Sequence, residues 1–358
     1  MISVRKIALL GVSVLVMVAL LGAPDSARAV RDTVKVFVLA GQSNMEGKAK
    51  QRLLDHQATD PKTKDFFAHL REGDKWAVRD DVFIKFLGRK GPLTIGYGSP
   101  ERTGSELEFG YLMGEHFDEP VILIKAAWGG HSLFKMFRPP SAGLPSEEAL
   151  QALLEKAQMK VERSNKKSGR NNPLPTMEDI KAPFGSSYRK MMAEVKEVLD
   201  DYETMFPALK DKKLELGGFF WFQGFNDKFG DFAPNEYEVN MKRFINDVRK
   251  DFNAPKLPFV IAAIGNNGSK PAEGSSLTVR EAQMAMNDVP EFQGNVKAFR
   301  TDLLVDKAAE KLYPAWQQNL EQWRLTGSDR PYHYYGSAIW YTRIGHAAGE
   351  AMLELMKN

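Results

Sequence analysis

The segment Val34–Met45 places the tightest constraint on what this chain can fold into. Its first seven residues are Val-Lys-Val-Phe-Val-Leu-Ala, and this apolar run ends abruptly in Gly-Gln-Ser-Asn. The pattern predicts a buried strand over Val34–Ala40 that stops at a tight turn. Ligands of open α/β sheets bind at the carboxyl ends of the strands. Ser43 is therefore a candidate nucleophile at this edge, where backbone N–H groups can stabilise developing negative charge.

Four more apolar runs have the character of strands, and most show little polar alternation, as expected when helices cover both faces. They are Val121–Ala126, Leu216–Phe222, Phe259–Ile264 and Val296–Thr301. Helical stretches precede each of them, and another closes the chain. These are Leu107–Phe117, Tyr188–Tyr202, Glu236–Phe252, Leu277–Met286 and Ser337–Met356. Strands that alternate with helices predict an α/β fold with a doubly wound parallel sheet.

The length fits one large α/β domain over residues 30–358 with two long insertions, and two domains are the alternative. The first insertion, near 50–90, is polar and irregular, and Val82-Phe83-Ile84 suggests a short extra strand within it. The second, near 139–183, is rich in Lys, Glu, Ser, Asn and Pro, with a helix expected over Ser146–Ser164. Such insertions form lids or rim loops around sites, or solvated excursions.

Residues 1–29 have the pattern of an export signal. A short basic start is followed by the apolar run Ile7–Gly22 and by Ala27-Arg28-Ala29, which matches a cleavage site. The run is short for a membrane span. We therefore expect an exported protein, periplasmic or extracellular, without stable membrane association after cleavage. An uncleaved anchor is the alternative.

Charge and cysteine content exclude several classes of function. Cleavage would remove three basic residues and one acidic residue, which lowers the net charge from +3 to about +1. A nearly neutral chain without a basic stripe predicts no nucleic-acid partner. The absence of cysteine excludes a thiol nucleophile and a cysteine–zinc site. The chain also lacks an H-E-x-x-H motif and a calcium loop, so we expect no metal and no cofactor.

Four separated segments carry polar side chains of definite chemical use. They are Gly41–Asn44, Gly104–Gly110, Trp221–Asp227 and Asp329–His333. A serine is a poor nucleophile without an adjacent base. His333 is the histidine that lies in a loop with aromatic neighbours, just before the last helix. Other interpretations are open: a serine at such a turn can cap the next helix, and an Asn-Asp pair can end a strand in a turn.

In these segments the chain resembles the SGNH hydrolase superfamily, and within it the sialate O-acetylesterase-like and carbohydrate esterase family 6 branch. The motifs that carry the resemblance are Gly41-Gln42-Ser43-Asn44-Met45, Gly104-x-Glu106-x-x-Phe109, Lys125-Ala126-Ala127-Trp128-Gly129-Gly130, Phe137-Arg138-Pro139-Pro140, Gly224-x-Asn226-Asp227 and His333. Each motif alone is modest, but together and in this order they are specific. The resemblance implies a three-layer α/β/α, flavodoxin-like fold. It also implies a serine esterase that removes O-acetyl groups from carbohydrates through an acetyl-enzyme.

The resemblance also implies roles for individual residues. Ser43 would be the nucleophile and His333 its general base. The oxyanion would be held by the Ser43 N–H, the Gly104 N–H and the Asn226 side-chain amide. A glycine suits such a position because its backbone N–H can approach the substrate without a Cβ in the way, and asparagine donates without carrying a charge.

One departure from the superfamily pattern concerns the acid that orients the histidine. The superfamily places it three residues before the histidine, where this chain has Arg330, and Asp329 lies four before. An added loop residue would still let Asp329 reach His333 Nδ1. The alternative is a Ser–His dyad in which a backbone carbonyl orients the imidazole.

Five further residues are candidates for the substrate-binding surface: Gln42, Trp128, His131, Arg138 and Gln223. An aromatic ring such as Trp128 can stack on a sugar, and His131 would line the pocket next to it. Arg138 would hold a carboxylate or hydroxyl of the ligand, or form an internal salt bridge. The amides of Gln42 and Gln223 would also tie their two loops together.

Two rival functions remain open. One is a lipase or thioesterase on the same scaffold, and the other is a non-catalytic carbohydrate-binding protein.

Overall fold

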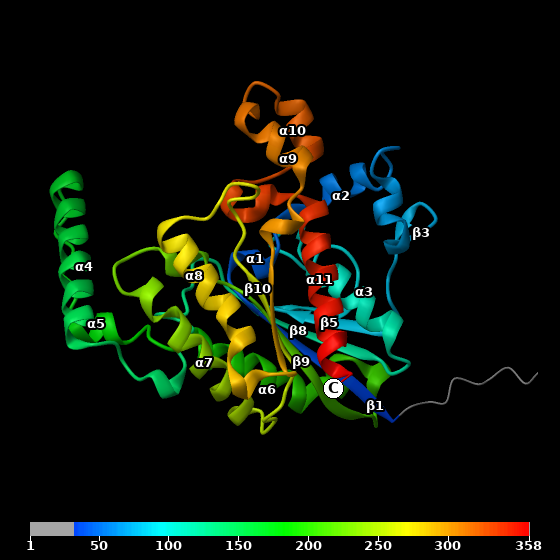
Figure 1. The fold of residues 1–358 in the computed structure, drawn as a ribbon, viewed down its shortest axis with the longest axis horizontal. Coiled ribbons are helices and arrows are strands. Elements are labelled where there is room, and N and C mark those ends of the chain that lie inside the picture. The colour runs from blue at the N-terminus through cyan, green and yellow to red at the C-terminus, as the bar shows by residue number, and fades with distance from the viewer. Residues whose placement is uncertain (1–31, 358) are drawn as a thin grey trace, which may run out of the picture. The chain divides into compact units, whose positions relative to one another are not determined.

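The computed structural model describes residues 32–357, which are built around a seven-stranded sheet (Figure 1). Across the sheet the strand order is β11-β10-β9-β1-β8-β5-β6. The strands are β1 (Thr33–Gly41), β5 (Val82–Phe86), β6 (Arg89–Pro92), β8 (Val121–Ala127), β9 (Lys213–Phe222), β10 (Phe259–Ala263) and β11 (Val296–Arg300). All neighbours are parallel except β6, which forms an antiparallel hairpin with β5 at the edge.

The five predicted strands are present and have the flavodoxin-type order. In the sheet, these five strands lie in the order β8, β1, β9, β10, β11. Numbered along the chain, this is the order 2-1-3-4-5 of doubly wound folds, with the switch point between the first and third strands. The suggested extra strand at Val82-Phe83-Ile84 is the start of β5, which extends the sheet beyond β8. The switch point lies between β1 and β9, so ligands are expected at the carboxyl ends of these two strands.

Helices cover both faces of the sheet, and β1 shows why. Val36 and Val38 pack on one side with α6 (Ser186–Met205), α7 (Ala233–Asp251) and α8 (Gly274–Met284). Phe37 and Leu39 pack on the other side with α3 (Glu106–His116) and α11 (Ala338–Met356). These β1 side chains are fully buried. Alternate residues of a strand point to opposite faces, so a strand that is apolar throughout needs two covering layers. The predicted three-layer α/β/α fold is confirmed.

The two predicted insertions differ in how they pack. Residues 50–90 contain α2 (Gln51–Gln57), the 3₁₀ helix η1 (Lys64–Leu70) and the small hairpin of β3 (Arg71–Glu72) and β4 (Lys75–Trp76). Buried Phe67 joins this insertion to the main core. Residues 139–183 contain α4 (Glu147–Ser168) and α5 (Met177–Lys181), which share a small separate cluster with Phe134. In Figure 1, α4 lies at the periphery, away from the sheet.

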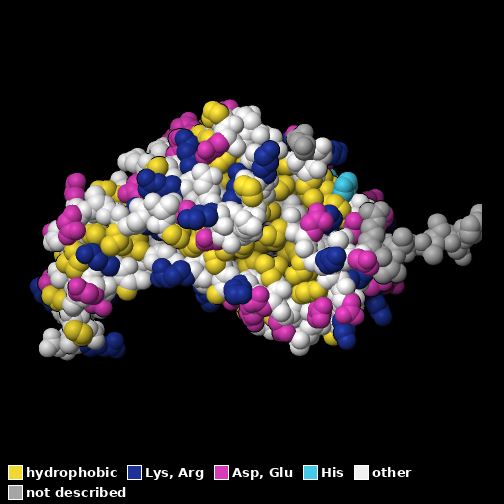
Figure 2. Space-filling view, turned by 90° about the horizontal axis from the view of Figure 1, so that it is seen from below, with side chains coloured by type: hydrophobic (Ala, Val, Ile, Leu, Met, Phe, Trp, Pro, Cys, Tyr) yellow, Lys and Arg dark blue, Asp and Glu magenta, His cyan; other side chains and the backbone are white. Residues whose placement is uncertain are grey.

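Short elements complete the chain. Those that border the site are α1 (Ser43–Glu46), β2 (Ala49–Lys50), β7 (Arg102–Thr103), η4 (Phe225–Lys228) and η9 (Pro331–Gly336). The others are η2 (Pro140–Ala142), η3 (Pro207–Leu209), η5 (Ala285–Asp288), η6 (Pro290–Phe292), η7 (Asp302–Leu304), α9 (Lys307–Leu312), η8 (Tyr313–Ala315) and α10 (Leu320–Thr326). Acidic and basic side chains are interspersed over the face seen in Figure 2.

The predicted export signal lies outside the described residues. Within residues 32–357, no helix has both the length and the apolar character that a membrane crossing requires.

Candidate active site

Ser43 begins α1 at the carboxyl end of β1, after a turn that requires glycine. Gly41 has a φ of +156°, and a Cβ on it would lie 2.2 Å from the Phe222 carbonyl oxygen of the neighbouring strand. The N-cap of α1 is Gln42 and Ser43 is already the first residue of the helix, so the interpretation of Ser43 as a cap does not hold. As the first residue of the helix, Ser43 has an N–H without an intrahelical partner.

His333 lies between Ser43 and Asp329. Its Nε2 is 3.0 Å from Ser43 Oγ, within hydrogen-bond range. Its Nδ1 is 3.2 Å from Asp329 Oδ2, within ion-pair range, although this contact lacks the alignment of a hydrogen bond. Burial raises the pKa of Asp329, but the contact with His333 and the backbone N–H of Arg330 outweigh it and leave that pKa lowered. The displaced acid therefore reaches the histidine in its charged form.

The loop that carries His333 is strained and tightly bonded. Tyr334 and Tyr335 have φ values of +53° and +58°, a region that non-glycine residues rarely occupy. The buried Tyr334 hydroxyl accepts a hydrogen bond from Gly265 N at 3.0 Å. The Tyr335 carbonyl accepts hydrogen bonds from both Ser328 N and Asp329 N, at 2.8 and 2.9 Å. These hydrogen bonds thus hold Asp329 and His333 in the same closed loop.

Asn44 links the nucleophile helix to the histidine loop. Its Nδ2 donates to the Tyr332 carbonyl at 3.2 Å, and its Oδ1 accepts from the Tyr341 hydroxyl of α11 at 3.1 Å. Sequence reasoning assigned it no role. The only signal was its place next to Ser43 in the motif, and nothing local indicates a partner almost 300 residues away.

The Asn226 amide is oriented by Gln42. Gln42 Nε2 donates to Asn226 Oδ1 at 2.8 Å, while Gln42 Oε1 accepts from Gly224 N and Asn226 N, both at 3.2 Å. Because the Asn226 oxygen is engaged, its Nδ2 is the group left to donate into the site. Gln42 is 1% exposed. The predicted tie between the two loops is present, and the hydrogen bonds of the Gln42 side chain go to this loop; a contact of Gln42 with substrate stays a prediction.

Gln223 is likewise buried, at 1% exposure, and its contact with substrate stays a prediction. Its Nε2 donates to Asp227 Oδ2 at 2.6 Å and to the His131 carbonyl at 3.0 Å. Asp227 also accepts from Leu133 N and Phe134 N at 2.9 and 2.7 Å. Asp227 therefore holds the loop after β8 by bonding backbone N–H groups. Burial raises the pKa of its carboxyl to about 6.

The N–H group of Gly104 already has a hydrogen-bond partner. Its N–H donates to Glu106 Oε1 at 2.8 Å, and the residue is buried. A Cβ on Gly104 would lie 2.6 Å from Gly47 Cα, so a glycine is needed there for close packing against the backbone after α1. The role of the Gly104 N–H as an oxyanion donor stays a prediction.

A fully buried ion pair, Lys125–Glu106, contacts α1, the helix that begins at Ser43. Lys125 Nζ lies 2.8 Å from Glu106 Oε2, and both side chains are 0% exposed. The ammonium also donates to the carbonyls of Glu46 and Tyr97, at 2.9 and 2.8 Å. Burial lowers the pKa of Lys125 despite the favourable charge of Glu106. The pair joins β8, α1 and the start of α3.

Gly129, which follows β8, is the backbone group beside the nucleophile. A Cβ on it would lie 3.6 Å from Ser43 Cβ. Its N–H donates to Glu46 Oε1 at 2.6 Å. Burial raises the pKa of Glu46, but contacts with Lys48, Ser99 and this N–H lower it overall. The two glycines after Trp128 were the sequence signal for this approach.

The remaining candidates divide into two kinds. Trp128 and His131 lie on the loop beside Gly129, with ring centroids 6.3 Å apart, and both are half-buried. His131 Nδ1 lies 2.6 Å from Ser187 Oγ, and burial lowers the pKa of His131.

Arg138 is 5% exposed, and its guanidinium binds Glu236 Oε2 at 2.8 Å. Arg138 therefore forms the internal salt bridge that was the alternative interpretation, and a role in substrate binding stays a prediction.

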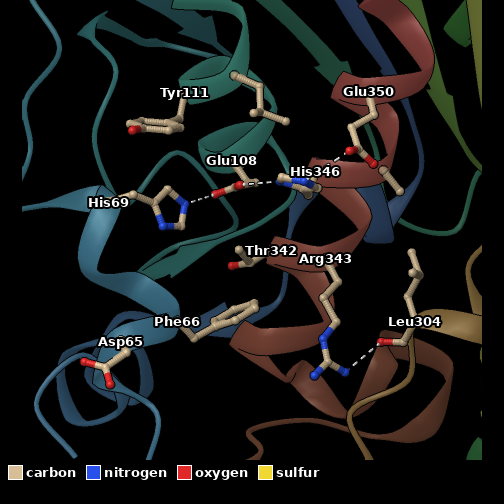
Figure 3. A pocket seen from close by; sticks show the side chains of 12 residues that line it. Asp65, Phe66, His69, Glu108, Tyr111, Leu304, Thr342, Arg343, His346 and Glu350 are labelled. Atoms are coloured by element: carbon tan, nitrogen blue, oxygen red, sulfur yellow. Dashed lines mark hydrogen bonds and ion pairs between the residues drawn. The ribbon is translucent and has the colours of Figure 1, made fainter. Parts of the chain in front are cut away.

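A separate pocket of about 610 Å³ lies between η1, α3 and α11 (Figure 3). Within it, the buried Glu108 carboxylate lies between two imidazoles, 2.7 Å from His69 Nε2 and 2.9 Å from His346 Nδ1. Its lining includes neither Ser43 nor His333. Among residues 32–357, no cluster of three or more His, Asp or Glu side chains is arranged to hold a metal ion.

Comparison with known proteins gives one family. The sequence profile of the family described as "Carbohydrate esterase, sialic acid-specific acetylesterase" matches residues 33–169 and 177–309, more than half of the chain. The match includes Ser43 and Asn226 but ends before Asp329. A protein of Arabidopsis thaliana named as a probable carbohydrate esterase is 32% identical over 88 residues, which are 24% of this chain and 32% of that protein. The chain therefore aligns with about a third of that relative's length.

Two solved structures are similar over most of this chain. One is an X-ray structure of a protein from Arabidopsis thaliana, with 17% identity, a TM-score of 0.47, and coverage of 89% of this chain and 97% of that one. The other is described as a novel carbohydrate acetylesterase from Xanthomonas citri. It has 15% identity, a TM-score of 0.43, and coverage of 88% of this chain and 55% of that one.

Proposed function

The chain belongs to the carbohydrate esterase family described as sialic acid-specific acetylesterase, and on that premise we propose that it is a serine esterase that removes O-acetyl groups from carbohydrates. The observation that carries this proposal is the 3.0 Å distance between Ser43 Oγ and His333 Nε2. Two segments 290 residues apart in the chain supply these groups at the switch point of the sheet, where doubly wound folds bind ligands. The proposal includes export, which the pattern of residues 1–29 favours.

The first step is acylation of the serine. Ser43 Oγ attacks the acetyl carbonyl carbon while His333 Nε2 takes the hydroxyl proton. The tetrahedral intermediate then collapses, the sugar oxygen leaves, and the imidazolium returns the proton to it. Ser43 is left as an acetyl ester. The Asp329 carboxylate stabilises the imidazolium at Nδ1 and fixes the tautomer of the ring.

Water completes the cycle by the same route in reverse. His333 takes a proton from water as it attacks the acetyl carbonyl, and acetate leaves when the Ser43 oxygen recovers the proton. No group outside the chain has to supply or accept electrons in this sequence.

Two donors are available for the oxyanion. One is the Ser43 N–H, which has no intrahelical partner, and the other is Asn226 Nδ2, which the Gln42 contact leaves free. Uncharged donors fixed in advance favour the charged intermediate over the neutral ester. The Gly129 backbone borders the same space, but its N–H already donates to Glu46 Oε1.

The proposal is tested by acetate release. The protein is incubated with acetylated xylan, pectin and O-acetylated sialic acid, and with simple esters of increasing acyl length. We expect acetate from at least one glycan and activity that falls steeply beyond acetyl. Activity that rises with acyl length would indicate a lipase or thioesterase. Tight binding of a glycan without any acetate release would indicate a binding protein.

A further inference from the structure

Three aromatic side chains form a partly exposed cluster next to the catalytic groups. Phe229 is 56% exposed and Tyr332 is 41% exposed, while Phe225 is half-buried between them. The ring centroid of Phe225 lies 5.4 Å from that of Phe229 and 5.7 Å from that of Tyr332. The rings come from η4, the residue after it, and η9, more than 100 residues apart in the chain. Contiguous exposed apolar surface of this kind marks binding sites.

This aromatic cluster is continuous with the catalytic groups on both of its loops. Phe225 directly precedes Asn226, the proposed oxyanion donor. Tyr332 directly precedes His333, and their ring centroids lie 4.6 Å apart at an interplanar angle of 69°. His333 Nε2 is in turn 3.0 Å from Ser43 Oγ, so His333 alone links the Tyr332 ring to the proposed nucleophile.

We propose that Phe229 and Tyr332, supported by Phe225, form the subsite that holds the sugar ring during deacetylation, by contact with the apolar C–H face of a pyranose. This inference rests on the proposed function and assigns the leaving-group side of the site. It moves the stacking role predicted for Trp128 to rings on the opposite side of Ser43, those that follow β9 and precede α11.

The chemistry of a pyranose fits this surface. Its hydroxyls lie around the rim, whereas its C–H groups form apolar faces that match the exposed faces of aromatic rings. Phe225 is packed by Phe229, Tyr332 and Lys228, so it supports the other rings rather than contacting the ligand itself. The Lys228 ammonium lies 4.2 Å from the Phe225 centroid and 5.2 Å from that of Phe229. It offers N–H donors to sugar oxygens at the rim of the aromatic cluster.

The test compares two substrates that share an acetyl group and differ in the sugar. Acetylated xylo-oligosaccharide presents a pyranose, and ethyl acetate does not; a p-nitrophenyl ester is avoided because its own ring would stack. The variants are Phe229→Ala and Tyr332→Leu, with Tyr332→Phe as the conservative partner. Val239→Ala on α7, where Val239 is 44% exposed, serves as the matched control for loss of an exposed apolar side chain.

We expect Phe229→Ala and Tyr332→Leu to lower kcat/KM for the oligosaccharide by about threefold to tenfold, mainly through KM. Their kcat/KM for ethyl acetate should fall by less, so the ratio of the oligosaccharide value to the ethyl acetate value should drop, and Tyr332→Phe, which keeps the ring, should keep this ratio at its wild-type value. Equal losses on both substrates would mean that the rings only shape the catalytic loops, and no loss on either would remove any role; each overturns the inference. A wild-type protein inactive on every acetate ester would instead overturn the proposed function itself.

Discussion

The side chain of Gln42 donates from Nε2 to Asn226 Oδ1 at 2.8 Å, and this hydrogen bond engages the oxygen of the Asn226 amide and leaves its Nδ2 as the donor. Gln42 Oε1 accepts from two backbone N–H groups of the same loop. The Gln42 amide is thus held at both its nitrogen and its oxygen, and it cannot rotate without breaking these hydrogen bonds. The residue that precedes Ser43 therefore orients Asn226 of η4, the proposed oxyanion donor.

Gln42→Glu should remove this orientation with little loss of packing. A carboxylate still accepts from the backbone N–H groups, but it cannot donate to Asn226 Oδ1, so the Asn226 amide is expected to turn its oxygen into the site. We expect kcat to fall by about 10²–10³-fold, the effect of losing one oxyanion donor. Steady-state kinetics with an acetate ester measure this. The double variant with Asn226→Ala should lose no more than Asn226→Ala alone, and additive losses would refute the link.

Asp329→Asn tests whether the site works as a triad. An amide keeps the size of the side chain but cannot stabilise the imidazolium, so we expect kcat to fall by about 10²–10⁴-fold at an unchanged KM. The contact to Nδ1 is imperfectly aligned, which is why the lower part of this range is included. Retention of activity within about threefold of wild type would instead favour the Ser–His dyad.

Lys125→Met should destabilise the fold strongly. It leaves the Glu106 carboxylate buried without its partner, which costs about 3–5 kcal/mol of unfolding free energy in denaturant titrations. Adding Glu106→Gln removes the uncompensated charge and should recover part of the loss. Lys196→Met breaks an ion pair whose side chains are 75% and 59% exposed, and it should change stability by less than about 1 kcal/mol. Similar effects of the two lysine variants would contradict the role given to the buried pair.

Asp227 should make stability depend on pH. Its pKa is raised from 3.8 to about 6 by burial, so between these values the folded protein binds more protons than the unfolded chain. The contribution of Asp227 to unfolding free energy is therefore greatest below pH 4 and is lost as the pH rises through 6, by about 3 kcal/mol in all. Subtracting the stability of Asp227→Asn from that of wild type at each pH isolates this contribution. A difference that is flat from pH 4 to 7 would contradict the burial effect.

The sheet could be predicted because each apolar run indicates a strand that is buried on both faces. A strand such as β1, apolar on both faces, needs helices on both sides, and the order of the segments then restricts the topology. Ser43, Asn226 and His333 follow from the same logic combined with the family pattern, since each one ends a strand or precedes a helix in a motif of recognisable spacing.

Several site assignments made from the sequence share one physical ambiguity. Gln42, Arg138 and Gln223 are polar residues in motifs, and sequence alone does not distinguish a polar group that faces a ligand from one that bonds to another loop. All three are at most 5% exposed. Gly104 shows the same ambiguity for a glycine, which serves close backbone packing as well as open access. Phe229 and Tyr332 were overlooked because their proximity depends on how two distant loops meet.

The proposed mechanism depends on Ser43 Oγ as the nucleophile that accepts the acetyl group from the sugar. Replacement of Ser43 is therefore the decisive test. Acetate release from an acetylated glycan is measured for wild type and for Ser43→Ala at matched concentration, with circular dichroism to show that both are folded. The account predicts that the variant loses about three or more orders of magnitude in kcat. Equal rates of acetate release by the two proteins would contradict it.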